Sequence, residues 1–246
     1  MRKVAQLSLS DKSGHRAAMA SRTIVFDLDG TLVDTAEDLA ASLNHALGAL
    51  GRPPIDPASV RPMVGQGARA LLQKGLAATG AASPALVERG VEPFLDFYAA
   101  NIAVWSRPYP LVEEVLERLA ARGDRLAICT NKPAALSAAL IDALGWTGRF
   151  AALLGADSLP VRKPDPAHLL RTIEAAGGTW EDALFVGDSI TDAKAAEAAR
   201  VPLVLVRHGY STIPVDTLPA QAVIDGFHQL EDALAQVQAM FNPDSR

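Results

Sequence analysis

Residues 23–34 read TIVFDLDGTLVD. The run TIVF is β-branched and aromatic, which predicts a short buried strand. Asp27 and Asp29 follow at once in the segment DLDG, where the aspartates and the glycine favour a turn. Beyond Asp34 the apolar residues recur at helical spacing. A short buried strand that passes through a turn into a helical pattern is typical of a parallel sheet wrapped by helices.

The same alternation of apolar runs and helical patterns continues along the chain. We expect three further central strands, at residues 126–130, 183–186 and 203–206. Alanine- and leucine-rich segments with helical spacing lie between them, for example around Leu136 and Leu140. The sequence therefore predicts an α/β fold whose core is a Rossmann-like parallel sheet with helices packed on its faces.

One long interval, residues 34–106, contains helical patterns and no convincing strand. It predicts a helical insertion. We expect its first helix to begin with a capping box formed by Asp34 and Glu37, and to stop at the segment GRPP at 51–54. The proline-rich passage at 106–110 is expected to be a stiff linker that returns the chain to the sheet.

These patterns divide the chain into three parts. We expect a flexible N-terminal extension at 1–21, an α/β core made of 22–33 plus 107–246, and an inserted helical cap domain at 34–106. Charged and polar residues interrupt every apolar run of the extension. It therefore has the pattern of neither a signal peptide nor a membrane anchor.

Composition and charge exclude several classes of protein. Of the 246 residues, 49% are hydrophobic and 21% are charged, the balance of an ordinary globular protein. The net charge of −5 gives no broad positive field, so we expect no nucleic-acid partner and no membrane partner. Cys129 is the single cysteine, which precludes an intrachain disulfide and suits a reducing cytoplasm. Nothing in the sequence indicates the oligomeric state.

Polar residues follow the predicted strands at the point where each strand ends. They are Asp27 and Asp29 after the first strand, Thr130 and Asn131 after the second, and Asp188 and Asp192 after the third. Lys163 precedes the third strand in the segment RKPDP, whose Asp165 is placed to cap the helix that Pro166 begins. Ligands of open parallel sheets bind outside the carboxyl ends of the strands, so we expect these side chains to converge on one edge.

In order, spacing and strand context, these motifs resemble those of the haloacid dehalogenase-like phosphatase superfamily. DLDGT at 27–31, Thr130, Lys163 and GDSITD at 187–192 match its four motifs, and the match covers essentially the whole chain after Ser21. The segments VFDLDGTLVDTAEDLAASLNHAL, VGQGARALL, TNKP, RKPDP and VGDSITD are similar to those of bacterial phosphoglycolate phosphatases. The resemblance implies a magnesium-dependent phosphomonoesterase with a helical cap and with 2-phosphoglycolate, a small phosphorylated metabolite, as substrate.

The chemistry of the residues agrees with this resemblance. A carboxylate such as that of Asp27 can attack phosphorus and form an acyl phosphate, which divides one displacement into two easier steps. Asp29 is placed to protonate the leaving alkoxide and then to deprotonate the water that cleaves the intermediate. Halide leaves without a proton, so this second aspartate favours phosphoryl transfer over dehalogenation. The carboxylates of Asp27, Asp29 and Asp188 repel one another unless a hard cation such as Mg²⁺ lies among them.

The resemblance also implies the roles of individual residues around the metal. The Asp27 carboxylate, the Asp29 main-chain carbonyl and the Asp188 carboxylate are expected to hold Mg²⁺. Asp192 is expected to support the metal-bound waters and Lys163.

The substrate is expected to meet a second group of residues. Lys163 would contact the phosphoryl oxygens, and Thr130 and the Asn131 amide would donate hydrogen bonds to them. Phosphoglycolate also carries a carboxylate, for which Arg69 is the candidate because its planar fork binds carboxylates through two hydrogen bonds. The loop at 65–67 is expected to face the site from the cap.

Three alternatives remain open from the sequence. The first is a phosphatase of the same superfamily with another small phosphorylated substrate, and the second is a phosphomutase that returns the phosphoryl group to a sugar. The third is a non-catalytic binding protein on the same scaffold. The combination of Asp27, Asp29, Lys163 and Asp188 argues against the third, because a silent relative has no chemical need for all four.

Overall fold

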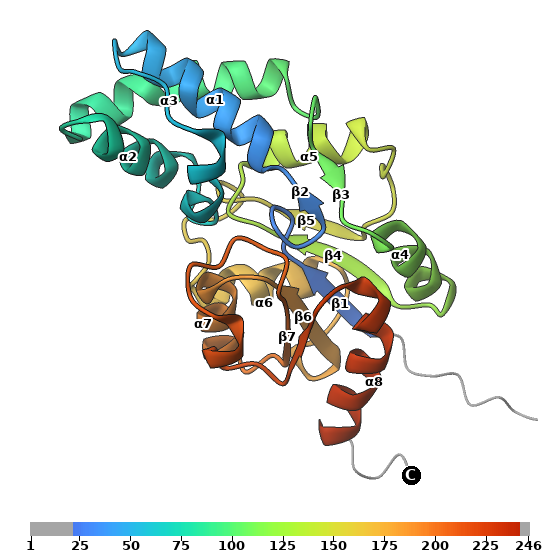
Figure 1. The fold of residues 1–246 in the computed structure, drawn as a ribbon. Helices are drawn as coiled ribbons and strands as arrows, with labels where there is room; N and C mark the ends of the chain where they lie inside the picture. The colour runs from blue at the N-terminus through green and yellow to red at the C-terminus, as the bar shows by residue number, and fades with distance from the viewer. Residues whose placement is uncertain (1–21, 242–246) are drawn as a thin grey trace, which may run out of the picture.

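The centre of the molecule is a six-stranded parallel sheet with the strand order β5-β4-β1-β6-β7-β8 (Figure 1). The strands are β1 (Thr23–Phe26), β4 (Arg125–Cys129), β5 (Ala152–Leu154), β6 (Ala183–Gly187), β7 (Leu203–Val206) and β8 (Ala222–Ile224). This computed structural model describes residues 22–241, so the expectation for 1–21 lies outside the described residues. The predicted Rossmann-like parallel sheet is confirmed.

Helices cover both faces of this sheet. They are α4 (Val112–Ala121), α5 (Ala134–Ala143), α6 (Pro166–Ala175), α7 (Ile190–Ala199) and α8 (Leu230–Phe241). Apolar side chains of α4, α5 and α8 share one cluster with Phe26 and Ile128, whereas those of α6 and α7 share another with Val25 and Cys129. Successive residues of a strand point to opposite faces, so burial on both sides explains why the central strands are almost entirely apolar.

The four predicted central strands are all present, and β5 and β8 are additional. Each of these two strands has three residues and lies at an edge of the sheet. An apolar run of three residues has no recognisable period, so the sequence did not distinguish it from a helix or a loop.

A separate helical lobe is formed by α1 (Ala36–Ala49), α2 (Ala68–Thr79) and α3 (Pro84–Ala100). These helices pack around their own apolar cluster, in which Leu43, Leu72 and Phe94 are fully or almost fully buried. Figure 1 shows the helical lobe beyond one end of the sheet. Two short antiparallel strands, β2 (Val33–Asp34) and β3 (Arg107–Pro108), bring the outgoing and returning chains side by side.

The start of α1 differs from the prediction. The predicted capping box is wrong, because the N-cap is Thr35, whose side chain makes no capping hydrogen bond. The Asp34 carboxylate accepts a long hydrogen bond from the Ala36 amide (3.3 Å) but pairs with the Arg61 guanidinium at 2.8 Å, and Glu37 is exposed. Both partners are charged in the bond to arginine, whereas a cap joins the carboxylate to a neutral amide, so the tertiary partner takes the carboxylate.

A buried carboxylate ties the two connections of the helical lobe together. Asp38, in the first turn of α1, is 1% exposed. It accepts hydrogen bonds from the amide of Trp105 (3.1 Å) and from the amide (2.7 Å) and hydroxyl (2.5 Å) of Ser106. The returning chain is therefore fixed to the helix that begins the lobe.

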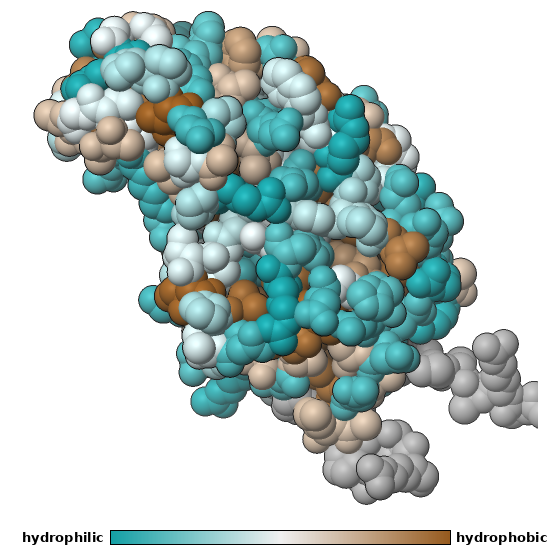
Figure 2. Space-filling model, viewed as in Figure 1, coloured by the Kyte–Doolittle hydropathy of each residue, from teal (hydrophilic) through white to brown (hydrophobic). Residues whose placement is uncertain are grey.

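One face of the molecule has the mixed surface of a globular protein. On the face drawn in Figure 2, hydrophobic side chains form separate patches between hydrophilic ones. Among the helices within residues 22–241, none has the length and apolar composition needed to cross a membrane.

Candidate active site

The predicted polar residues meet at the carboxyl ends of β1, β4 and β6. Asp27 follows β1 directly, and its amide donates to the Val186 carbonyl at 2.9 Å, so the β1–β6 pairing fixes its position. Thr130 follows β4, and its amide donates to the Leu154 carbonyl at 3.0 Å. The parallel register thereby places residues that are a hundred positions apart in sequence on one edge of the sheet.

Lys163 is the buried cation of this edge. Its side chain is 1% exposed, and Nζ lies 3.0 Å from Asp27 Oδ1 and 2.7 Å from Asp192 Oδ1. Burial alone would lower the pKa of Lys163, but the neighbouring carboxylates of Asp192 and Asp27 raise it above its ordinary value. Lys163 is therefore a permanent positive charge beside Asp27.

His168 and Asp165 hold the loop that carries Lys163. The Lys163 amide donates to His168 Nδ1 (3.2 Å), and His168 Nε2 lies 3.1 Å from the Gly155 carbonyl oxygen. Asp165 is the N-cap of α6 and accepts a hydrogen bond from the Ala167 amide at 2.9 Å, which confirms the predicted cap.

Asp188 follows β6 and is held from two sides. Its Oδ1 accepts from the Thr31 hydroxyl (2.8 Å) and its Oδ2 from the Tyr210 amide (2.7 Å). A Cβ added to Gly30 would lie 2.7 Å from Asp188 Oδ2, and one added to Gly209 would lie 2.2 Å from Asp188 Cβ. Glycine at both positions is therefore required for this carboxylate to reach the site.

Asp192 is occupied by donors of its own. Besides Lys163 on Oδ1, its Oδ2 accepts from the Ser189 amide (3.1 Å) and hydroxyl (2.6 Å) and from the Asp188 amide (3.3 Å). The Asp192 amide in turn donates to the Ser189 hydroxyl oxygen (3.3 Å), which completes a capping box at the start of α7. Asp192 thus accepts four hydrogen bonds, as many as a carboxylate has lone pairs, whereas Asp188 accepts two. Asp192 is therefore better suited to orienting Lys163 than to binding a ligand directly.

The acidic cluster at this edge fits a hard metal ion. Ligand oxygens of Asp27, Asp188 and Asp192 lie within 4.8 Å of one another, and all three side chains are buried. Burial raises the pKa of Asp27 to about 7, with Lys163 opposing and Asp192 adding to this rise. Burial, Asp192 and Asp27 together raise the pKa of Asp188 well above its usual range. A divalent cation relieves this repulsion, and carboxylate oxygens are its preferred ligands.

A pocket separates this edge from the helical lobe. From the sheet side it is lined by Asp27, Asp29, Thr130, Asn131, Lys132, Pro133 and Leu136. From the helical lobe and its loops it is lined by Leu39, Val64, Gly65, Gly67, Ala68, Leu71, Phe94, Leu95 and Tyr98. The floor is thus polar and acidic, whereas the roof is mostly apolar.

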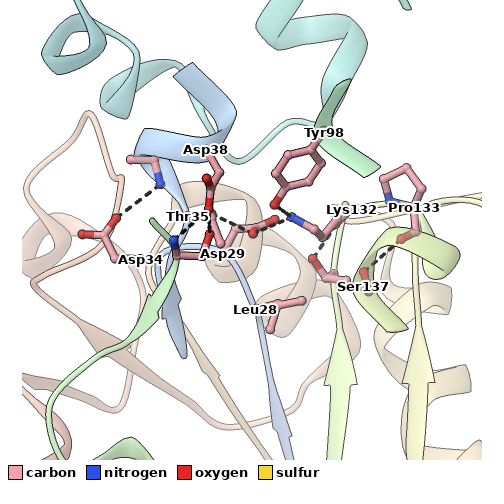
Figure 3. Close-up of polar contacts among 12 residues, drawn as sticks. Leu28, Asp29, Asp34, Thr35, Asp38, Tyr98, Lys132, Pro133 and Ser137 are labelled. Atoms are coloured by element: carbon pink, nitrogen blue, oxygen red, sulfur yellow. Dashed lines mark hydrogen bonds and ion pairs between the residues drawn. The ribbon is translucent and has the colours of Figure 1, made fainter. Parts of the chain in front are cut away.

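Asp29 and Lys132 form an ion pair in this floor, as Figure 3 shows. Asp29 Oδ1 accepts from the Thr35 hydroxyl (2.8 Å) and from Lys132 Nζ (3.0 Å). Lys132 also donates to the Tyr98 hydroxyl from helix α3, and its ammonium lies 4.2 Å from the centre of the Tyr98 ring. Burial lowers the pKa of Lys132, and the charge of Asp29 opposes that effect.

Residues 21–200 match the family of haloacid dehalogenase-like hydrolases. The chain belongs to this family. The phosphoglycolate phosphatase of Caulobacter vibrioides is 49% identical over 210 residues, covering 83% of this chain and 87% of the relative. That of Mesorhizobium japonicum is 48% identical over 219 residues, covering 89% and 96%. These findings identify the chain as a phosphatase of the haloacid dehalogenase-like family.

A solved structure has the same fold. It is described as a predicted phosphoglycolate phosphatase from Haemophilus somnus, with a TM-score of 0.81 and 33% sequence identity, and it covers 87% of this chain and 98% of its own. The resemblance drawn from the four sequence motifs is confirmed.

Arg69 is not placed where the sequence suggested. Its guanidinium pairs with Glu88 at 2.8 Å between helices α2 and α3, its side chain is 59% exposed, and it does not line the pocket of the phosphatase. Two other cationic side chains of this part of the chain do not line the pocket either: Arg61 pairs with Asp34, and Lys74 donates to the Met63 carbonyl. Arg69 is two residues beyond the loop at 65–67, but this nearness in sequence did not show which face of helix α2 the side chain occupies.

Lys132 is the site residue that the sequence analysis missed. The segment TNKP gave a signal, because this lysine stands immediately after Thr130 and Asn131 at the edge where ligands bind. Asn131 lines the same pocket, and its Nδ2 donates to the Lys163 carbonyl (3.0 Å) and to the Gly65 carbonyl (3.4 Å). The loop at 65–67 lines the pocket, as predicted.

Proposed function

We propose that this phosphatase hydrolyses 2-phosphoglycolate to glycolate and phosphate, with Mg²⁺ as its metal. The observation that carries the proposal is the pair of carboxylates, Asp27 and Asp29, in the floor of one pocket. One can attack phosphorus while the other handles the proton of the leaving group. Two relatives named phosphoglycolate phosphatase, at 49% and 48% identity, support the choice of substrate.

In the first half-reaction Asp27 is the nucleophile. The Leu28 amide (2.7 Å) and Lys163 Nζ (3.0 Å) both reach its Oδ1, so Oδ2 is the oxygen available for attack. The bond from Asp27 to phosphorus forms as the bond from phosphorus to the glycolate oxygen breaks. Asp29, in its protonated form, gives its proton to that oxygen, which becomes the hydroxyl group of the departing glycolate.

In the second half-reaction Asp29 reverses its role. As a carboxylate it takes a proton from water, whose oxygen attacks the phosphorus of the aspartyl phosphate. The bond between phosphorus and Asp27 breaks, inorganic phosphate leaves, and both aspartates return to their starting states. The Thr35 hydroxyl and Lys132 hold Asp29 Oδ1 in place, so its other oxygen remains for proton transfer.

The remaining residues stabilise charge on the phosphoryl group. Lys163 neutralises the oxygens nearest Asp27, and Thr130 and the Asn131 amide donate to the phosphate. The carboxylates of Asp27 and Asp188 and the Asp29 main-chain carbonyl would hold Mg²⁺, which when bound supplies further neutralisation of phosphate charge.

Asp192 supports Lys163 rather than the phosphate.

The helical lobe acts as a cap over small substrates. We propose the same domain bounds as the sequence predicted, with the core at 22–33 plus 107–246 and the cap at 34–106. The buried single cysteine is compatible with activity in a reducing cytoplasm.

The test is a panel of phosphomonoesters assayed by release of inorganic phosphate after EDTA treatment and readdition of Mg²⁺. We expect phosphoglycolate to give the highest kcat/KM and activity to return with Mg²⁺. A different preferred ester would refute the substrate, and phosphate retained on a sugar acceptor would indicate a mutase.

A further inference from the structure

Lys132 carries the single cationic side chain among the described residues that line the pocket. Lys163 lies behind Asp27 and is engaged by two carboxylates. Arg162 is exposed, and its guanidinium comes near Gly67, but it does not line the pocket. Apart from the phosphoryl group, whose oxygens nearest Asp27 are assigned to Lys163, an anionic group on a substrate therefore has one cation to meet in the lining of this pocket.

The surroundings of Lys132 suit it to bind a ligand. Its side chain is 3% exposed, yet the residue lines the pocket. An ammonium group has three protons to donate, and the hydrogen bonds to Asp29 and Tyr98 use two of them. The third remains for a ligand. A substrate carboxylate under the apolar roof of Phe94 and Leu95 would be costly to desolvate without such a partner.

The chemistry of the reaction brings a carboxylate to this place. Asp29 must reach the oxygen that leaves from phosphorus, and Lys132 Nζ is 3.0 Å from Asp29 Oδ1. In phosphoglycolate the carboxylate is attached to the carbon that bears the leaving oxygen. A substrate bound for proton transfer from Asp29 thus has its carboxylate close to Lys132.

We propose that Lys132 binds the substrate's carboxylate and makes the phosphatase selective for esters with an anionic group beside the phosphate. The inference rests on the proposed function. Tyr98 is the positioning residue: its hydroxyl accepts from Lys132 and its ring lies against the ammonium, which fixes the lysine to helix α3. Selectivity therefore depends on the helical lobe being in place over the pocket.

The experiment compares two substrates that differ in the group of interest alone. These are phosphoglycolate and 2-hydroxyethyl phosphate, in which a CH₂OH group replaces the carboxylate. Lys132→Met keeps an unbranched side chain of similar length without charge. The measured quantity is the kcat/KM for phosphoglycolate divided by that for 2-hydroxyethyl phosphate. We expect Lys132→Met to lower this ratio by about 10- to 100-fold. Any effect of the substitution on Asp29 is common to both esters and cancels in the ratio.

Further variants separate this role from a structural one. Tyr98→Phe keeps the ring and removes the hydroxyl, and we expect it to lower the ratio less than Lys132→Met does. Arg69→Met removes an exposed cation of the helical lobe and should leave the ratio unchanged. A ratio that falls in Arg69→Met or Arg162→Met, and not in Lys132→Met, would overturn the assignment.

The wild-type enzyme tests the inference without any variant, since equal kcat/KM for the two esters overturns it. Equal losses on both esters in Lys132→Met, with phosphoglycolate still the preferred wild-type substrate, would also overturn it and leave the proposed function standing. If the wild type rejects phosphoglycolate, the proposed substrate is wrong. The same ratio is then measured with 2-phosphoglycerate and glycerol 2-phosphate, in which a CH₂OH group again replaces the carboxylate on the carbon that bears the leaving oxygen. No preference for the carboxylate in that pair would overturn the inference.

Discussion

Acid should destabilise this protein through His168, a buried side chain that holds the loop carrying Lys163. His168 is fully buried. An amide nitrogen can only donate, so the 3.2 Å contact with the Lys163 amide makes Nδ1 the acceptor and leaves the proton on Nε2, which donates to the Gly155 carbonyl. Protonation of Nδ1 would break the first bond and place a charge beside Lys163. The imidazole must therefore stay neutral in the folded protein.

The magnitude follows from the pKa of His168 in the two states. Burial, and then the charge of Lys163, lower it from 6.5 to about 4 in the folded protein. The unfolded chain binds the proton first as the pH falls, so this contribution to stability is complete above pH 6.5 and is lost towards pH 4. At 1.36 kcal/mol per pKa unit the whole effect is roughly 3 kcal/mol, of which about 2.5 kcal/mol appears between pH 7.5 and 4.5.

The assay is urea unfolding of wild type and His168→Asn at these two pH values, in EDTA. Asparagine Oδ1 can accept the Lys163 amide bond in place of Nδ1 and does not titrate. The free energy of unfolding of the variant relative to wild type should therefore rise by about 2.5 kcal/mol as the pH falls. His228→Asn removes an exposed imidazole and serves as the control. An unchanged difference between His168→Asn and wild type at the two pH values would refute the reasoning.

Three further outcomes are expected. Asp27→Asn should lower phosphate release by at least about 10³-fold in a folded protein, and near wild-type release would remove it as nucleophile. Mg²⁺ at a hundredfold excess over its Kd should stabilise the wild type by about 2.7 kcal/mol in thermal melts against EDTA, and Asp188→Ala should lose that gain. Asp38→Ala should reduce the free energy of unfolding by about 3 kcal/mol because the Trp105 and Ser106 donors lose their buried acceptor, whereas the exposed Glu37→Ala should change it by less than about 0.5 kcal/mol.

The central strands were predictable because the sheet buries them on both faces. Val25, Ile128 and Val204 are fully buried, so whole runs of sequence are apolar and stand out against the helical patterns. The edge strands β5 and β8 did not stand out, because three residues contain too little pattern. The predicted capping box of α1 was wrong because Arg61, which is distant in sequence, pairs with the Asp34 carboxylate.

The catalytic edge was predictable from topology. Asp27, Thr130 and Asp188 follow strands that pair with one another in parallel, so their convergence follows from the order of strands alone. Lys163 belongs to a loop and not to a strand end, so the prediction of its position rested on the resemblance to known motifs. The interactions of Lys132 were not predictable, because its partner Tyr98 comes from a helix whose orientation over the sheet no local pattern specifies.

Charge recognition and shape recognition therefore come from different parts of the chain. The helical lobe contributes apolar side chains such as Leu71 and Phe94 to the roof of the pocket, and these can exclude water and large substituents without distinguishing a carboxylate from an alcohol. The cation stands on the loop after β4, next to the aspartate proposed as general acid. A carboxylate bound there has its own leaving oxygen within reach of Asp29 by virtue of its covalent structure. The contact between the substrate's carboxylate and Lys132 therefore also aligns the leaving oxygen with Asp29. An ester that lacks the carboxylate loses both the charge contact and the alignment.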